Sequence, residues 1–139
     1  DIVNARIKFV NGSCATLTAS RVSQEPLRRF RVFQEDGYIS MDYGQHLGMV
    51  MKRNKLGLAR RDVELDEKNA LAAELEDFIA AVKATQASGE VVPAKVPGEA
   101  GLRALELVLA IYKSAAEHRP VQLPLESCST MDFVGRFDR

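Results

Sequence analysis

Apolar and polar side chains alternate along the first half of the chain, and the spacing then changes to that of helices. Alternation with a period of two is typical of strands that have one buried face. It begins with Val3, Ala5, Ile7 and Phe9. Further strands are predicted near residues 28–34, 37–43, 46–53 and 58–65.

Two amphipathic helices are predicted after the strands, over about 69–86 and 98–118. In each, apolar residues recur three and four positions apart, which places them in one stripe along a helix. Strands followed by helices predict an α+β fold. We expect a mostly antiparallel, open-faced sheet with the helices packed on one face and the other face free for oligomerisation. Residues 1–123 would form this domain, and residues 124–139 a C-terminal tail.

The turn at Asn11 and Gly12 leaves two registers open for the first hairpin. A two-residue turn would pair Phe9 with Cys14 and put the polar residues of the second strand on the apolar face. A three-residue loop, with Gly12 as its left-handed residue, pairs Phe9 with Ser13 and joins the apolar residues of both strands on one face. We therefore predict the three-residue loop. The opposite face then collects Asn4, Arg6, Lys8, Thr16, Thr18 and Ser20.

Composition places the chain among ordinary globular domains. It has 139 residues, 46% of them hydrophobic and 27% charged, and its 19 basic residues balance 19 acidic ones. That neutrality gives no general attraction to nucleic acid or anionic lipid, and no apolar run approaches the roughly 20 residues that cross a bilayer. Cys14 and Cys128 fit no zinc or redox motif, so free thiols and a cytoplasmic location are expected.

No catalytic constellation is recognisable in the sequence. Metalloprotease, nucleophile-elbow, P-loop and glycine-rich dinucleotide patterns are all absent. His46, placed within a predicted strand, and His118, at a predicted helix end, are expected to be structural or surface residues. We therefore expect no catalytic, cofactor-binding or metal-binding residue in this chain.

Two groups of polar side chains on the first hairpin carry the binding hypotheses. Thr18, Ser20 and Arg21, at the end of the second strand, are the substrate-binding candidates. An arginine there can hold a phosphate or carboxylate through two parallel hydrogen bonds, and it can equally pair with a neighbouring acid. The face that neither predicted helix covers is a natural self-association surface. Its oligomer-face candidates are Asn4, Arg6, Lys8 and Thr16.

Three segments together resemble a known family of oxidoreductases. They are DIVNARIKFVNGSCATLTASRVS, LRRFRVFQEDGYISMDY, and the helical pair LAAELEDFIAAVKATQ and VPGEAGLRALELVLAIYKSA. Their order is similar to the C-terminal domain of the glucose-fructose oxidoreductase / inositol dehydrogenase / rhizopine-catabolism (Gfo/Idh/MocA) family, over about residues 1–123. The helical pair, entered through Gly98 and Gly101, is its most specific marker.

The resemblance implies a full-length enzyme with an N-terminal Rossmann domain that this chain lacks. That domain would hold NAD or NADP and the catalytic groups, so the chain alone is expected to bind no cofactor and to be inactive. The implied substrate is a sugar, a cyclitol or a nucleotide sugar, and the segment ATLTASRVS is most similar to members acting on UDP-N-acetyl sugars. This domain would supply one wall of the pocket and the interface of a homodimer or homotetramer.

A stand-alone, non-catalytic module that dimerises or binds a ligand is the alternative. The chain begins at Asp1 with no initiator Met and enters a strand pattern at once, which favours a piece of a longer protein. A glycine-rich fingerprint encoded upstream would support the oxidoreductase, and a start codon just before Asp1 would support the stand-alone module.

Overall fold

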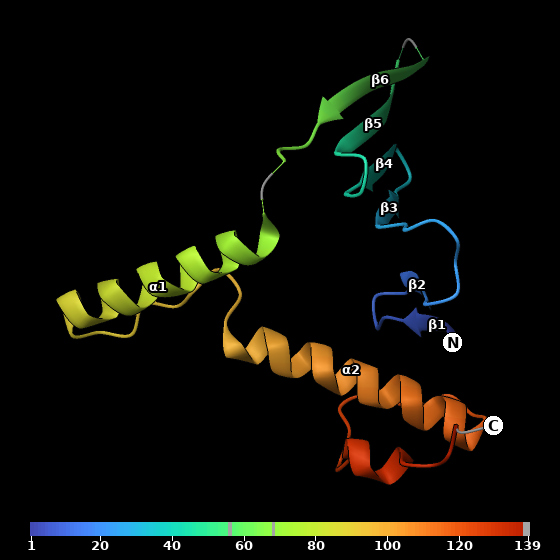
Figure 1. The fold of residues 1–139 in the computed structure, drawn as a ribbon. Helices are drawn as coiled ribbons and strands as arrows, with labels where there is room; N and C mark the ends of the chain where they lie inside the picture. The colour runs from blue at the N-terminus through green and yellow to red at the C-terminus, as the bar shows by residue number, and fades with distance from the viewer. Residues whose placement is uncertain (56, 68, 138–139) are drawn as a thin grey trace. The chain divides into compact units, whose positions relative to one another are not determined.

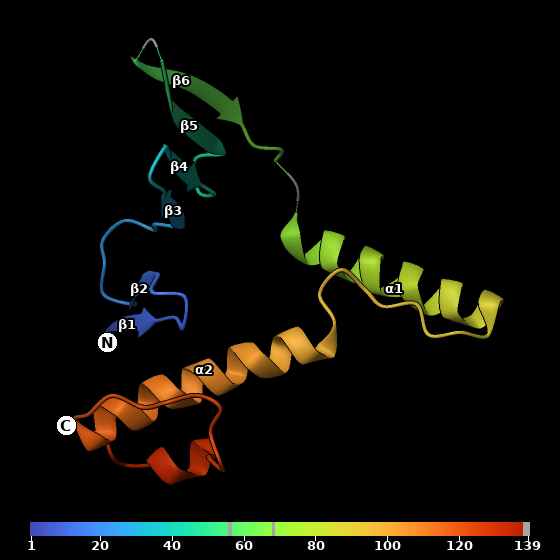
Figure 2. The same ribbon diagram turned by 180° about the vertical axis from the view of Figure 1, so that it is seen from behind.

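The computed structural model describes residues 1–55, 57–67 and 69–137 as antiparallel strands followed by helices (Figures 1 and 2). The strands form a two-stranded sheet and a four-stranded sheet. The chain divides into two compact units, the first ending at Ala70 and the second beginning at Leu71. An α+β fold with open antiparallel sheets is thereby confirmed, and the packing of the helices on a sheet face stays a prediction.

Strands β1 (Ile2–Lys8) and β2 (Cys14–Ser20) form the first hairpin in the predicted register. Ala5 lies opposite Leu17, and the amide of Phe9 donates to the carbonyl of Ser13 at 2.9 Å. Gly12 has a φ of 85°, in the left-handed region that a three-residue loop requires. The three-residue loop is confirmed, because this register alone joins the apolar side chains of both strands.

Strands β3 (Arg29–Phe33), β4 (Gly37–Asp42), β5 (Leu47–Asn54) and β6 (Gly57–Glu64) form the second sheet in chain order. All four predicted strands are confirmed to within a residue or two. The register brings apolar side chains of successive strands together on one face of the sheet. They are Phe30, Val32, Ile39, Met41, Val50 and Val63.

The helices also lie where the spacing predicts them, as α1 (Ala70–Ser88) and α2 (Gly98–Glu117). The loop after α1 returns along that helix: the amide of Val92 donates to the Thr85 hydroxyl at 2.9 Å, and the amide of Lys95 donates to Asp77 at 2.8 Å. The apolar stripe of α1 is not buried. Its exposed members are Leu71, Leu75, Phe78, Ile79 and Val82.

The C-terminal tail folds back on α2 instead of extending away from it. Its short 3-10 helix, η1 (Thr130–Phe133), begins with Ser129, whose side chain caps the helix. The rings of Phe133 and Phe137 each lie 5.7 Å from that of Tyr112 on α2. The Glu106 carboxylate accepts the amide of Leu125 at 2.7 Å. Aromatic contacts and this hydrogen bond thus hold the tail.

Replacing Gly12 with Ala should selectively weaken the hairpin. A side chain at Gly12 would meet no atom within 4 Å, so the cost comes from its left-handed backbone, about 1 kcal/mol. Amide hydrogen exchange should show the protection factor of the Phe9 amide falling about fivefold. Gly101→Ala is the matched control, because it also enters open space but lies within α2, where alanine favours the helix. Equal loss of protection in both variants would contradict the account.

Candidate functional site

The polar face of the first hairpin brings most of the predicted binding residues side by side. Asn4 lies opposite Thr18, and Arg6 opposite Thr16, in the cross-strand register, with Lys8 following on β1. The Thr18 hydroxyl donates to Asn4 Oδ1 at 2.9 Å. The substrate candidate Thr18 and the oligomer-face candidate Asn4 therefore form one bonded pair, and Thr18 lies on the same surface as the oligomer-face candidates.

Arg21 and Ser20 do not contribute to this surface in the same way. The Arg21 guanidinium pairs with the carboxylate of Asp1, and its amide donates to the Asp1 carbonyl at 3.0 Å. The pair lies just past the end of the ladder, where Ile2 is opposite Ser20. Ser20 accepts the amide of Val22 at 3.2 Å, which turns the chain away from β2. Of the two roles that the sequence allowed for Arg21, binding an anionic ligand or pairing with a neighbouring acid, the structure has the second.

The polar face is cationic and rich in hydrogen-bond donors. Arg6 and Lys8 are exposed, and neither has an ion pair within the described part of the chain. The Thr18 hydroxyl occupies Asn4 Oδ1, so the Asn4 side-chain NH2 is the group left to donate outward. None of the strand residues on this face is acidic. Such a surface suits a ligand that carries negative charge and acceptor oxygens.

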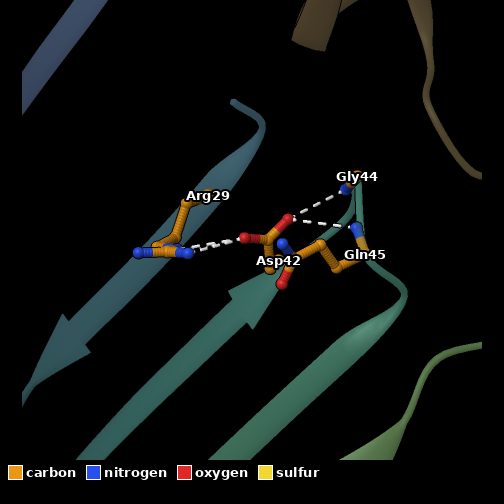
Figure 3. Close-up of polar contacts among 4 residues, drawn as sticks. All are labelled: Arg29, Asp42, Gly44 and Gln45. Atoms are coloured by element: carbon orange, nitrogen blue, oxygen red, sulfur yellow. Dashed lines mark hydrogen bonds and ion pairs between the residues drawn. The ribbon is translucent and has the colours of Figure 1, made fainter. Parts of the chain in front are cut away.

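A second polar cluster surrounds Asp42 at the end of β4 (Figure 3). Its Oδ2 accepts Arg29 Nη2 at 2.8 Å and Nε at 3.2 Å, and its Oδ1 accepts the amides of Gly44 at 3.0 Å and Gln45 at 3.2 Å. The Asp42 side chain is only 10% exposed. Since both oxygens bind within the fold, Asp42 joins β3 to β4 and closes the turn into β5, which is a structural role.

Sequence reasoning did not identify the Asp42 cluster. The sequence does carry one indication of this cluster, an aspartate followed two residues later by glycine. That pattern is typical of an aspartate whose side chain accepts hydrogen bonds from the backbone of the turn that follows it. The hydrogen bond from Arg29 holds the pKa of Asp42 below its ordinary value of 3.8; burial opposes this, and the amides of Gln45 and Gly44 add to the lowering. The unfolded chain therefore takes up this proton at a higher pH than the folded chain does.

The histidines and cysteines form no further site among the described residues. His46 has a φ of 54° in the turn before β5, so its predicted place within a strand is wrong. His118 ends α2 with a φ of 53°, as a helix-end residue. Cys14 and Cys128 are free thiols. The described part of the chain contains no cluster of metal-ligating side chains, and none of its helices is long and apolar enough to span a membrane.

A hollow in the second unit lies near the C-terminal end of α2. It has a volume of about 580 Å³ and is lined by Ala115, Ala116, His118, Arg136 and Phe137. The predicted binding residues all belong to the first unit, so the hollow contains none of them. The polar hairpin face is therefore the surface on which the binding hypotheses rest.

Comparison with known proteins identifies a dehydrogenase as a homologue. No family model matches the chain. UDP-N-acetylglucosamine 3-dehydrogenase from Acidithiobacillus ferrooxidans is 36% identical over 117 residues, covering 80% of this chain and 36% of the relative. A solved structure of that bacterium's UDP-N-acetylglucosamine 3-dehydrogenase, GnnA, has a TM-score of 0.69 at 37% identity, over 80% of this chain and 34% of its own.

A second solved structure of GnnA, from another crystal form, gives the same relation. Its TM-score is 0.58 at 36% identity, over 75% of this chain and 32% of that one. The chain is thus homologous to this dehydrogenase over most of its own length, and it spans 36% of the length of the curated relative.

Replacing Asp42 with Asn should destabilise the four-stranded sheet near neutral pH, because Arg29 loses its carboxylate partner. The substitution should also make the stability of the fold less sensitive to acid. In the unaltered chain, ionised Asp42 stabilises the fold above pH 3.8, and this stabilisation is lost as the pH falls through the lower pKa of the folded state. Urea unfolding followed by circular dichroism at about pH 7 and about pH 3 measures both effects.

Asp62→Asn is the matched control for this prediction. Asp62 pairs with Arg60 at 2.9 Å, but both side chains are more than 60% exposed, so the pair contributes little. The account fails if Asp62→Asn changes the stability and its pH dependence as much as Asp42→Asn does.

Proposed function

We propose that this chain is the substrate-side, C-terminal domain of a Gfo/Idh/MocA-family oxidoreductase that acts on a nucleotide sugar, specifically UDP-N-acetylglucosamine. The proposal rests on homology, because a relative named as a UDP-N-acetylglucosamine 3-dehydrogenase is 36% identical over 80% of the chain. The TM-score of 0.69 to a solved structure of that enzyme adds support at the level of the fold.

The described residues do not fit NAD or NADP. A dinucleotide domain needs parallel strands with a glycine-rich turn between a strand and a helix, whereas both sheets of this chain are antiparallel. Gly98 and Gly101 begin α2, but the preceding residue, Pro97, follows a loop and not a strand. Under the proposal, another domain of the Rossmann type holds NAD or NADP, and the chemistry of hydride transfer lies outside this chain.

This chain would supply a wall of the substrate pocket and surfaces for subunit contact. Thr18, Ser20 and Arg21 remain the candidates for the wall, and the face carrying Asn4 and Arg6 is one candidate for contact in a homodimer or homotetramer. Free thiols suit the reducing cytoplasm, which we propose as the location. A stand-alone ligand-binding or dimerising module remains the alternative that the following experiment separates.

Oxidation of UDP-N-acetylglucosamine by the native protein that carries this sequence tests the proposed function. With NAD or NADP present, we expect nicotinamide reduction to follow the concentration of UDP-N-acetylglucosamine, and free N-acetylglucosamine to serve poorly because it lacks the nucleotide. The chain of residues 1–139 alone should show neither turnover nor saturable quenching with NADH. Saturable binding of NADH by the chain alone, or no nicotinamide reduction by the native protein, would overturn the proposal.

A further inference from the structure

We infer that residues 119–137 form a strap that closes over the C-terminal half of α2 and reserves that side of the helix from other domains and subunits. The strap consists of the segment that leaves α2, the short helix η1 and the residues that follow η1. This inference does not depend on the proposed function. It goes beyond that function by giving a conformational role to a segment that the sequence marked only as a tail.

Burial along the apolar stripe of α2 changes sharply near the middle of the helix. Apolar residues three or four positions apart lie on one side of a helix, as Leu102, Leu105 and Leu109 do here. Leu102 is 67% exposed and Leu105 is 51% exposed, whereas Leu109 is only 9% exposed. Among the described residues, Leu109 and its neighbour Ala110 are the only buried hydrophobic side chains. The covered part of α2 therefore begins between residues 105 and 109.

The course of the strap matches this boundary. The strap leaves the end of α2, where the Ser114 hydroxyl donates to the Arg119 carbonyl at 2.8 Å. It then runs out along the helix as far as Glu106, whose carboxylate accepts the Leu125 amide at 2.7 Å, and it returns through η1 (Figures 1 and 2). Its furthest contact on α2 thus lies just before the first buried residue of the stripe.

An aromatic cluster closes the strap on its return. The Tyr112 ring stacks with that of Phe133 at a centroid distance of 5.7 Å, and the ring of Phe137 lies at the same distance from it, tilted by 52°. Such ring pairs stabilise a contact beyond the effect of the area they bury. The start of η1 is fixed because the Asp132 carboxylate accepts the Ser129 amide at 2.8 Å. The rings therefore hold the strap at two points, one in η1 and one after it.

A partner that packs on this side of α2 must displace the strap. A small hollow of the second unit is lined by residues of both α2 and the strap, which include Lys113, Ala116, Glu117, Cys128 and Phe133. Leu109 and Ala110 lie between Glu106 and Lys113, both of which border the strap. The chain itself therefore occupies this side of the helix, and the N-terminal half of the stripe is the part left for other packing.

Hydrogen exchange across α2 in the native protein tests the strap. Phe133→Ala combined with Phe137→Ala removes both rings that contact Tyr112, so exchange of residues 106–117 should become about tenfold faster, with a smaller effect on residues 98–105. Met131→Ala combined with Val134→Ala is the matched control. It shortens two apolar side chains of the same segment that are 74% and 71% exposed, and it should leave exchange within about twofold. Tyr112→Phe keeps the ring and should also leave exchange unchanged.

The half-buried thiol of Cys128 gives a second measurement that needs no variant. Its alkylation by iodoacetamide, followed by mass spectrometry, should be at least about tenfold slower in the native protein than in the same protein unfolded in urea. In the Phe133→Ala and Phe137→Ala protein it should become faster, and in the control it should not.

Three results would overturn the inference. One is exchange of residues 106–117 that the double phenylalanine variant does not change, which would mean that something other than the strap covers α2. Another is an equal change in the Met131→Ala and Val134→Ala control. The third is alkylation of Cys128 as fast in the native protein as in the unfolded one, which would show an open strap even if the phenylalanine variant failed to fold.

Discussion

The register of the β1–β2 hairpin determines which side chains this chain presents for binding. Side chains alternate between the two faces of a strand, so a slip of one residue would move every polar group of β2 to the apolar side. Gly12 permits the three-residue loop through its left-handed backbone, and the pairing of Phe9 with Ser13 follows from that loop. The acid-free row of donors exists only because this register brings Thr16 and Thr18 beside Arg6 and Asn4.

The rest of each unit is held together locally and leaves apolar surface uncovered. In the first unit, Asp42 joins two strands and a turn through four hydrogen bonds. In the second, aromatic contacts hold the tail on α2, while Phe78 on α1 is 59% exposed. Burying such apolar area stabilises proteins by about 25 cal/mol per Å². These apolar faces are the ones that the predicted packing of the helices on a sheet face would cover.

Local patterns predicted the elements of this fold well, because alternation and helical spacing depend on residues close together in sequence. The hairpin register was also predictable, since only one loop length unites the apolar face. Asp42 was missed because its role depends on the pairing of β3 with β4, which brings Arg29 to it from 13 residues away. His46 was placed in a strand because sequence alternation does not reveal a positive φ. The tail contacts likewise depend on Phe137 meeting Tyr112 from beyond the end of α2 and η1.

Homology to a UDP-N-acetylglucosamine 3-dehydrogenase underlies the proposal that this domain supplies a wall of the pocket for a nucleotide sugar. A crystal structure of the native protein with UDP-N-acetylglucosamine tests that account most directly. We predict electron density for the nucleotide sugar in contact with Thr18, Ser20 or Arg21, with Arg6 opposite Thr16 in the hairpin. Density for the nucleotide sugar that contacts no residue of this chain, or a hairpin shifted by one residue, would contradict it.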